Sequence, residues 1–442
     1  MHNKGRFPNV MFGARLRPDS AALAIMVLLL FLIFVFLFLT VTAQPAEGQR
    51  FNVIYTFTNE PDGILPIDLR MDAAGDLYGT TAEGGFTRDD CAPIGCGTDF
   101  KLWNRGSGWV LRPLYSFLGG TDGAHPLSGV SIGANGIFYG ATEYGGGGYV
   151  DGGTVYSLRP IASASRCRAG SCLWTEIVLH RFLGGSDGLY PVSPVVFDRD
   201  GNIYGTTWLG GGSGNGGYGY GTVYKLSPSG SNWTETVLYS FTGGNDGGGP
   251  GGVIFDTVGN LYGTAGGGAA GCGTVFRLSP SGFGWTENTL YSFQCGSDGS
   301  GPSDLVFDQS GNLYGATYSG GSGGGGTVYE LVRSSNGWTF TLLHSLSGAA
   351  GPVGRLTIDT AGNLYGTARE DGAYGWGSIF KLTPGSGGWT YTDLYDFAGG
   401  IDGGQPQGSV VLDGHGDLFG VTPWGGAGQG YSGYGVVWEI TP

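Results

Sequence analysis

Three charged residues interrupt a series of small residues at one recurring position of this 442-residue chain. A carboxylate can serve as a general base and a guanidinium can bind an anion, so the three could form a polar ligand site. Ion pairing among them is the structural alternative, and the sequence does not show that any carboxylates pair at a catalytic spacing. Glu83, Glu143 and Glu370 could join such a site. The full series reads Asp68, Gly129, Pro194, Gly252, Asp304, Arg355 and Ser409.

Aromatic residues in glycine-rich segments form a second group of candidates. Rigid rings on an acidic, polar surface are platforms on which sugar rings stack, although glycine-rich loops also need aromatic residues to hold their shape. We select Trp208, Tyr318 and Trp424 as candidate ligand contacts. The wider group is Tyr144, Tyr149, Trp208, Tyr218, Tyr220, Tyr318, Tyr374, Trp376, Trp424, Tyr431 and Tyr434.

Other conspicuous acids recur in unit after unit, which favours a structural role. Each precedes a glycine-containing turn, where an aspartate accepts hydrogen bonds from backbone amides. Calcium needs six to eight converging oxygens, which one aspartate per loop does not supply, so we predict neither a metal nor a cofactor. No Gly-x-Ser-x-Gly elbow supports a nucleophilic serine. The two series are Asp72, Asp198, Asp256, Asp308, Asp359 and Asp413, and Asp62, Asp122, Asp187, Asp246, Asp298 and Asp402.

A unit repeated seven times must position these residues. The phrase Asn-Leu-Tyr-Gly-Thr, or a variant, recurs at intervals of 51 to 65 residues, with its glycine at 79, 140, 205, 263, 315, 366 and 420. Each unit also has an apolar run before a turn, a Gly-Thr-Val-Tyr phrase and a Trp-to-Phe phrase, and all four have the composition of strands. Stacking such four-stranded sheets in a ring buries both faces of each, so the sequence predicts a seven-bladed β-propeller.

The two ends of the repeat region predict how the ring closes. Residues 51–57 match the fourth strand of a unit, whereas the last unit stops after its third strand at residues 435–440. We therefore expect the N-terminal strand to complete the last blade and remove an open edge. The loops between the second and third strands, and those between units, should emerge on one face of the ring.

Six cysteines fall into three local pairs that we interpret as disulfides rather than zinc ligands. In the fourth unit, Cys272 begins the third strand and Cys295 follows the fourth, so a hairpin brings them together. The other pairs lie in loops. The expected disulfides are Cys91–Cys96, Cys167–Cys172 and Cys272–Cys295.

Residues 1–43 form an export leader, with basic residues followed by an uncharged segment from Ala21 to Ala43. Small residues at 41–43 favour cleavage before Gln44, but the apolar run approaches the length of a membrane span, so an uncleaved anchor is the alternative. Both place residues 44–442 outside the cytoplasm. Without the leader the chain has 17 basic and 34 acidic residues, and this net charge of −17 argues against nucleic-acid binding.

The recurring phrases resemble those of GloVer tandem-repeat proteins of the choice-of-anchor bacterial surface group. The phrases are Gly-Asn-Leu-Tyr-Gly-Thr, Gly-Thr-Val-Tyr-Lys-Leu and Leu-Tyr-Ser-Phe, and the similarity covers nearly all of residues 51–442. The resemblance implies an exported, surface-displayed repeat protein and brings no catalytic residues. We expect a monomeric binding or display module for carbohydrate or another surface protein, in contact with a membrane only through the leader. A lyase or hydrolase acting on polysaccharide at the channel mouth is the alternative.

Overall fold

The computed structural model describes residues 49–442, except 87–90, 107, 134–135, 148–150, 161–173, 213, 283, 336 and 429. The leader, the expected Cys167–Cys172 disulfide and Tyr149 lie outside the described residues. Within the described part of the chain, no helix is long and apolar enough to cross a membrane. Residues Arg50–Pro442 form one compact unit.

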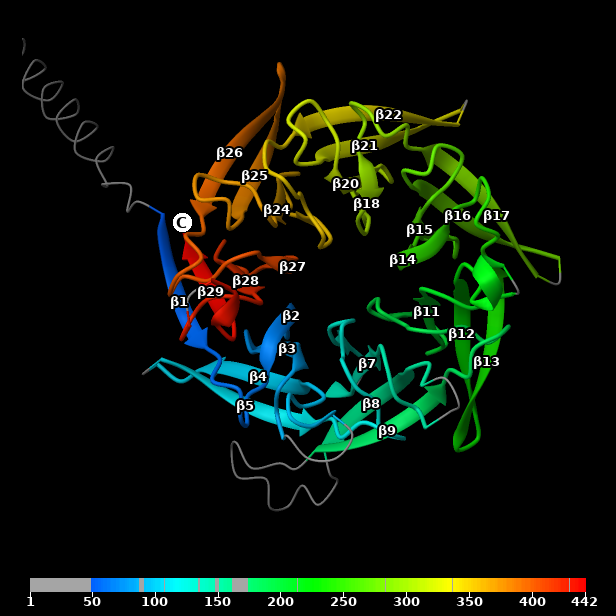
Figure 1. Ribbon diagram of the computed structural model, residues 1–442. Coiled ribbons are helices and arrows are strands. Elements are labelled where there is room, and N and C mark those ends of the chain that lie inside the picture. The colour runs from blue at the N-terminus through cyan, green and yellow to red at the C-terminus, as the bar shows by residue number, and fades with distance from the viewer. Residues whose placement is uncertain are drawn as a thin grey trace, which may run out of the picture. The chain divides into compact units, whose positions relative to one another are not determined.

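This unit is a seven-bladed propeller of antiparallel sheets, as predicted (Figure 1). We name the strands of each blade A to D from the central channel outward. Blades 1 to 4 have these strands in order A to D: β2 (Ile64–Met71), β3 (Leu77–Glu83), β4 (Thr98–Asn104) and β5 (Trp109–Ser116); β6 (Ser131–Ile132), β7 (Phe138–Thr142), β8 (Thr154–Pro160) and β9 (Trp174–Arg181); β10 (Val196–Phe197), β11 (Ile203–Thr207), β12 (Thr222–Ser229) and β13 (Asn232–Ser240); β14 (Gly248–Phe255), β15 (Leu261–Gly266), β16 (Thr274–Ser281) and β17 (Gly284–Ser292).

The remaining three blades follow the same pattern with small variations. In blade 5, strand A is split into two short pieces that both pair with strand B. The strands are β18 (Ser300–Pro302) with β19 (Val306–Phe307), β20 (Leu313–Ser319), β21 (Thr327–Ser334) and β22 (Gly337–Ser345); β23 (Thr357–Ile358), β24 (Leu364–Ala368), β25 (Ser378–Gly385) and β26 (Gly388–Asp396); and β27 (Gln407–Leu412), β28 (Leu418–Thr422), β29 (Val436–Thr441) and β1 (Arg50–Thr56).

The ring closes as the sequence predicts, because β1 is strand D of blade 7. It pairs antiparallel with β29, from Arg50 opposite Thr441 to Thr56 opposite Val436. In Figure 1 the blue β1 lies beside the red β29. Phe51 also stacks on Tyr395 of blade 6, with ring centroids 3.7 Å apart. The first and last segments of the propeller therefore share one sheet.

The core lies between neighbouring blades, which explains the Leu-Tyr-Gly phrase of strand B. One cluster joins blades 7 and 1 and contains Phe57, Leu69, Phe100 and Val437, all almost fully buried. The phrase's glycine is needed for close approach, because a Cβ at Gly205 would collide with the ring of Tyr224 on strand C. The strand D tryptophans pack across to the preceding blade, as Trp285 does on Tyr204.

Candidate functional site

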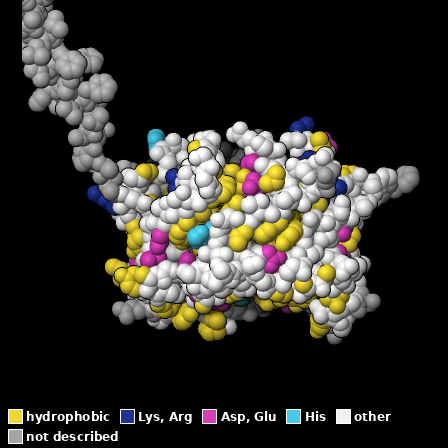
Figure 2. Space-filling model, turned by 90° about the horizontal axis from the view of Figure 1, so that it is seen from above, with side chains coloured by type: hydrophobic (Ala, Val, Ile, Leu, Met, Phe, Trp, Pro, Cys, Tyr) yellow, Lys and Arg dark blue, Asp and Glu magenta, His cyan; other side chains and the backbone are white. Residues whose placement is uncertain are grey.

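The loops from B to C and from D to the next A emerge together on one face, which we call the loop face. Isolated bridges join the two loop types, as between Ala124 and Tyr144 and between Gly404 and Trp424. This confirms the prediction that the variable loops share a face. Figure 2 shows the propeller from the side, where charged side chains are scattered and much of the surface is backbone or uncharged polar groups.

In six of the seven blades the D–A loop contacts the preceding blade through the same backbone hydrogen bond, whereas in blade 6 the N–H of Gly351 donates to the carbonyl of Tyr318. In blade 7 the backbone N–H of Gln405 donates to the carbonyl of Trp376 at 2.6 Å, and in blade 2 that of His125 donates to Cys96 at 2.9 Å. Both donors have a positive φ, of 52° and 56°. A proline follows and packs on the glycine that begins strand C of the preceding blade, as Pro406 does on Gly377. The side chain before that proline varies between blades, so the scaffold presents different groups at an equivalent place.

The recurring aspartates are structural, as expected. Asp198 Oδ1 accepts backbone N–H groups from Asp200 and Asn202, both at 2.9 Å, and its other oxygen accepts the Tyr204 hydroxyl. In the second series, Asp246 Oδ2 accepts the Tyr239 hydroxyl at 2.9 Å and the Thr242 N–H at 2.8 Å. These carboxylates stabilise turns through hydrogen bonds, so their oxygens are already occupied within the protein.

The central channel brings together Asp68, Asp304 and Arg355, as the sequence analysis proposed. They line a cavity of about 310 Å³ to which inner segments of all seven blades contribute. Arg70, which the sequence analysis missed, lines it too, and its Nη1 lies 2.8 Å from Asp68 Oδ2. Residues two apart on a strand point to the same side, and this alternation is the signal that could have identified Arg70.

Both aspartates of the channel also hold neighbouring blades together. Asp68 Oδ1 accepts the backbone N–H of Ser409 in blade 7 at 2.8 Å, and Asp304 Oδ1 accepts that of Gly252 in blade 4 at 2.7 Å. Burial raises the pKa of Asp304, although the Gly252 N–H and the charge of Arg355 oppose this rise. Burial lowers the pKa of Arg355, and the charge of Arg70 adds to the effect.

The three glutamates that could have joined the channel site lie elsewhere. Glu83, Glu143 and Glu370 are not among the residues that line the central cavity. Glu83 lines a separate cavity of about 340 Å³ with His125 and Tyr144. Glu370 accepts a hydrogen bond from Gln405 on the loop face. The reason is positional, because all three side chains follow or end strand B, whereas strand A lines the channel.

Every aromatic side chain that is strongly exposed in the described part of the chain lies in a B–C segment, counted from the last residues of strand B to the start of strand C. Trp208 is 51% exposed and Tyr318 is 37% exposed, and they belong to blades 3 and 5. Trp424, in blade 7, is half-buried. The three selected aromatics therefore share the loop face without meeting in one pocket. The exposed set is Phe86, Tyr144, Trp208, Tyr218, Tyr318, Tyr374, Tyr431 and Tyr434.

One aromatic group of the loop face lies where blades 6 and 7 meet, and we call Trp376, Trp424 and Tyr431 the blade 6–7 platform. The Tyr431 ring lies 5.0 Å from that of Trp376 and 5.3 Å from that of Trp424. Tyr431 is 62% exposed, so its ring is open to a ligand.

A buried amide fixes this platform in place. Gln405 is 2% exposed, and its Nε2 donates to the Tyr431 hydroxyl at 2.8 Å and to Glu370 at 3.2 Å. Its Oε1 accepts two hydrogen bonds from Arg369. Gln405 and Arg369 were not among the predicted site residues, because their network joins a D–A loop to two B–C segments that are distant in the chain.

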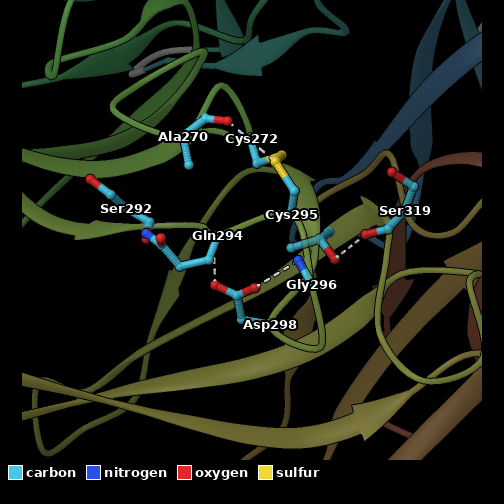
Figure 3. Close-up of a disulfide and its surroundings, with 9 residues drawn as sticks. Ala270, Cys272, Ser292, Gln294, Cys295, Gly296, Asp298 and Ser319 are labelled. Atoms are coloured by element: carbon cyan, nitrogen blue, oxygen red, sulfur yellow. Dashed lines mark hydrogen bonds between the residues drawn. A yellow bond between two sulfur atoms is a disulfide. The ribbon is translucent and has the colours of Figure 1, made fainter.

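Two of the three expected disulfides lie within the described residues, and both are present. Cys272 pairs with Cys295 beside the C–D hairpin of blade 4, and Cys91 pairs with Cys96 in the B–C loop of blade 1. Figure 3 shows the first pair next to the turn in which Asp298 accepts the N–H groups of Gln294 and Gly296. Among the described residues, no group of three or more His, Cys, Asp or Glu side chains could hold a metal ion.

The fold and the loop face define a closed seven-bladed propeller built from tandem repeats. The model of the Gloeobacter/Verrucomicrobia repeat family matches residues 40–218, 168–351 and 283–442, so the chain belongs to that family. This confirms the resemblance that the recurring phrases indicated. No curated protein matches the chain.

Solved structures of other proteins match the chain at low sequence identity. A catalytically inactive virginiamycin B lyase from Staphylococcus aureus, with quinupristin, is 13% identical and has a TM-score of 0.53, covering 89% of this chain and 100% of the lyase. A putative oxidoreductase (glucose dehydrogenase) from Thermus thermophilus is 14% identical with a TM-score of 0.39, covering 89% and 100%. A gluconolactonase from Xanthomonas campestris is 11% identical with a TM-score of 0.40, covering 89% and 90%. The likeness to the lyase concerns the fold alone.

Proposed function

We propose that this protein is an exported binding module that holds carbohydrate on its loop face. The observation that carries the proposal is the confinement of the strongly exposed aromatic side chains to B–C segments. Aromatic faces bury the apolar side of a sugar ring, while polar groups beside them hydrogen-bond its hydroxyls. The blade 6–7 platform has both, since Arg369 and Glu370 lie around the amide that fixes Tyr431.

The alternative is a lyase or hydrolase with its site at the channel mouth. Asp68 and Asp304 would be its candidate bases, but each already accepts a backbone N–H from a neighbouring blade. Such a carboxylate is costly to move, because its withdrawal leaves the backbone N–H of the neighbouring blade without an acceptor. These contacts favour the binding role.

Glycan-array binding by the purified chain tests the proposal. We expect binding to at least one glycan class, and we expect Trp424→Ala to weaken it by about tenfold, or ~1.4 kcal/mol. Trp208→Ala, tested separately, shows whether blade 3 contributes. Val258→Ala is the control, because Val258 is 77% exposed and lies on the A–B turn of blade 4, at the opposite end of the strands from the loop face. Binding that survives both tryptophan substitutions, or no binding to any glycan, contradicts the proposal.

Export is supported by the two disulfides, since such bonds persist in oxidising compartments. We expect the chain to occur outside the cytoplasm with Cys272 and Cys295 unreactive toward maleimide until a reductant is added. Thiols that react without reductant would place the folded chain in a reducing compartment.

A further inference from the structure

The central cavity contains one guanidinium that the protein leaves without a contacting partner. Arg70 is engaged by Asp68 and also donates to the carbonyl of Leu69. Arg355 lines the same cavity, and no hydrogen bond or ion pair joins its side chain to any residue that the structure describes. Asp304 and Asp68 act on Arg355 through their charges but do not hydrogen-bond it, so the N–H groups of the guanidinium remain available to an anion.

We propose that Arg355 binds the carboxylate of an acidic sugar in the central cavity. A guanidinium presents parallel N–H groups that match the two oxygens of a carboxylate. The cavity, of about 310 Å³, has room for one sugar residue, and Ser128, Ser193, Gly251 and Ser409 form part of its wall. The wall also carries Asp68, Arg70 and Asp304, and Arg70 is paired with Asp68, so Arg355 is the cation that remains to bind a ligand's negative charge.

The charges of the cavity favour a singly charged ligand over a phosphate dianion. Asp68 and Asp304 line the same cavity as Arg355, and a second negative charge on the ligand would be repelled by both. A carboxylate brings only the one charge that Arg355 can neutralise. Burial also raises the pKa of Asp304, and in its protonated form this residue could donate a hydrogen bond to the ligand.

The cavity lies toward the loop-face end of the channel, because residues of several D–A loops line it, Leu127 and Val192 among them. Val353 lines it and is 38% exposed, and it belongs to the D–A loop of blade 6. A glycan held on the loop face could therefore place an acidic residue in the channel mouth. The inference rests on the proposed function in this respect, because a bound glycan is what would bring the carboxylate there.

Calorimetric titration of the full chain with sodium glucuronate tests the site without needing the aromatic platform. We expect saturable binding of glucuronate and none of glucose at the same concentrations. Arg355→Gln should weaken glucuronate binding by about tenfold or more, since hydrogen bonds to a charged partner are lost. Arg333→Gln is the charge-matched control, because Arg333 is exposed near the C–D hairpin, away from the channel. The Arg333→Gln protein should bind glucuronate with the same affinity as the unaltered chain.

Three outcomes would overturn the inference. They are equal binding by the Arg355→Gln protein, equal binding of glucose and glucuronate, and inorganic phosphate binding more tightly than glucuronate at matched ionic strength. Thermal unfolding with and without glucuronate provides a second measurement, in which only chains with Arg355 should gain stability. Trp424→Ala should leave free glucuronate binding unchanged, so failure of the channel site and failure of the aromatic platform are distinguishable.

Discussion

A single residue, Asp99, departs from the repeat inside the core of the propeller. Strand C has a buried aliphatic residue at this position in the other blades, as at Val155, Val223 and Val275. Asp99 is 1% exposed; its Oδ1 accepts the Tyr156 hydroxyl at 3.0 Å, and its Oδ2 has no partner among the described residues. Burial raises the pKa of Asp99 to about 8, even though the Tyr156 hydroxyl opposes this rise.

We predict that Asp99→Val stabilises the protein and flattens its dependence on pH. The folded pKa of about 8 exceeds the unfolded value of ~3.9, so between them the folded state holds a proton that the unfolded state releases. Stability is therefore lost as the pH rises through this window, by up to about 1.4 kcal/mol per pH unit for one group. The substitution should raise the free energy of unfolding by ~1–3 kcal/mol near neutral pH, because burying the carboxyl costs more than leaving the Tyr156 hydroxyl without an acceptor, as those of Tyr224 and Tyr329 already are.

Urea unfolding at pH 5 and pH 7.5 measures the effect. Some pH dependence should remain in the variant, because burial and the charge of Asp122 raise the pKa of Glu176 to about 8 as well. The same difference in stability between the two pH values, with and without Asp99, would contradict the prediction.

A second prediction at the residue scale concerns Asp304 as a structural group. Asp304→Ala leaves the Gly252 N–H without its acceptor and should lower the free energy of unfolding by ~1–3 kcal/mol. Asp304→Asn keeps an acceptor oxygen and should cost less. Denaturant titration of both variants distinguishes them, and an alanine variant as stable as the parent would show that the inter-blade contact is energetically unimportant.

At the scale of elements, the recurring phrases were sufficient to predict the strands, whereas the side-chain networks were not predictable. Strand B is fixed by Leu-Tyr-Gly because the leucine and tyrosine face neighbouring blades and the glycine admits the strand C ring. The Gln405 network could not be predicted, since it depends on how a D–A loop crosses to the preceding blade. Similarly, the sequence placed Glu83, Glu143 and Glu370 at the ends of B strands and suggested that they could join the channel site. They do not line the channel, because strand A lies between strand B and the channel.

The hairpin of strands C and D in blade 4 supports a third prediction. The Cys272–Cys295 disulfide closes a loop of sequence separation 23, and its removal by Cys272→Ser with Cys295→Ser should cost about 3 kcal/mol in unfolding free energy. The Cys91–Cys96 disulfide closes a much shorter loop, with a separation of 5, and its removal should cost about 2 kcal/mol. Denaturant unfolding of both serine pairs tests the order, and a larger loss for the shorter loop would contradict it.

At the scale of the whole molecule, the ring depends on a contact between the two ends of the propeller. β1 pairs with β29 along its length, and Phe57, which follows it, is fully buried in the cluster between blades 7 and 1. Without β1, β29 would be an exposed edge strand, and edges of this kind pair with other chains. Closure therefore joins blades that are far apart in sequence into one cooperative unit.

Circular permutation separates two roles of β1. It is the fourth strand of blade 7, and it joins the N-terminal end of the propeller to the C-terminal end. A chain that starts at Asn59 and continues from Pro442 through a short Ser-Gly-Ser turn into Arg50–Thr58 joins β29 to β1 as an ordinary C–D hairpin. Arg50 lies opposite Thr441, so Pro442 and the three added residues form a four-residue turn, which is two residues longer than the turn between Ser229 and Asn232 in blade 3. We expect this permutant to fold, whereas a chain that lacks residues 1–57 should unfold at lower denaturant concentration and aggregate.

In both variants the N-terminal end of the chain no longer pairs with its C-terminal end. Only the truncated chain also lacks the fourth strand of blade 7, so the two variants separate the two roles. If the permutant is as stable as the natural order, β1 acts through the edge it covers and the core residue it supplies, and the order of the chain contributes little to equilibrium stability. Size-exclusion chromatography and urea unfolding of the permutant, the truncated chain and the natural chain provide the measurement. A truncated chain that stays monomeric and equally stable would show that blade 7 needs only three strands, and that the ring is held by the contacts between its inner strands alone.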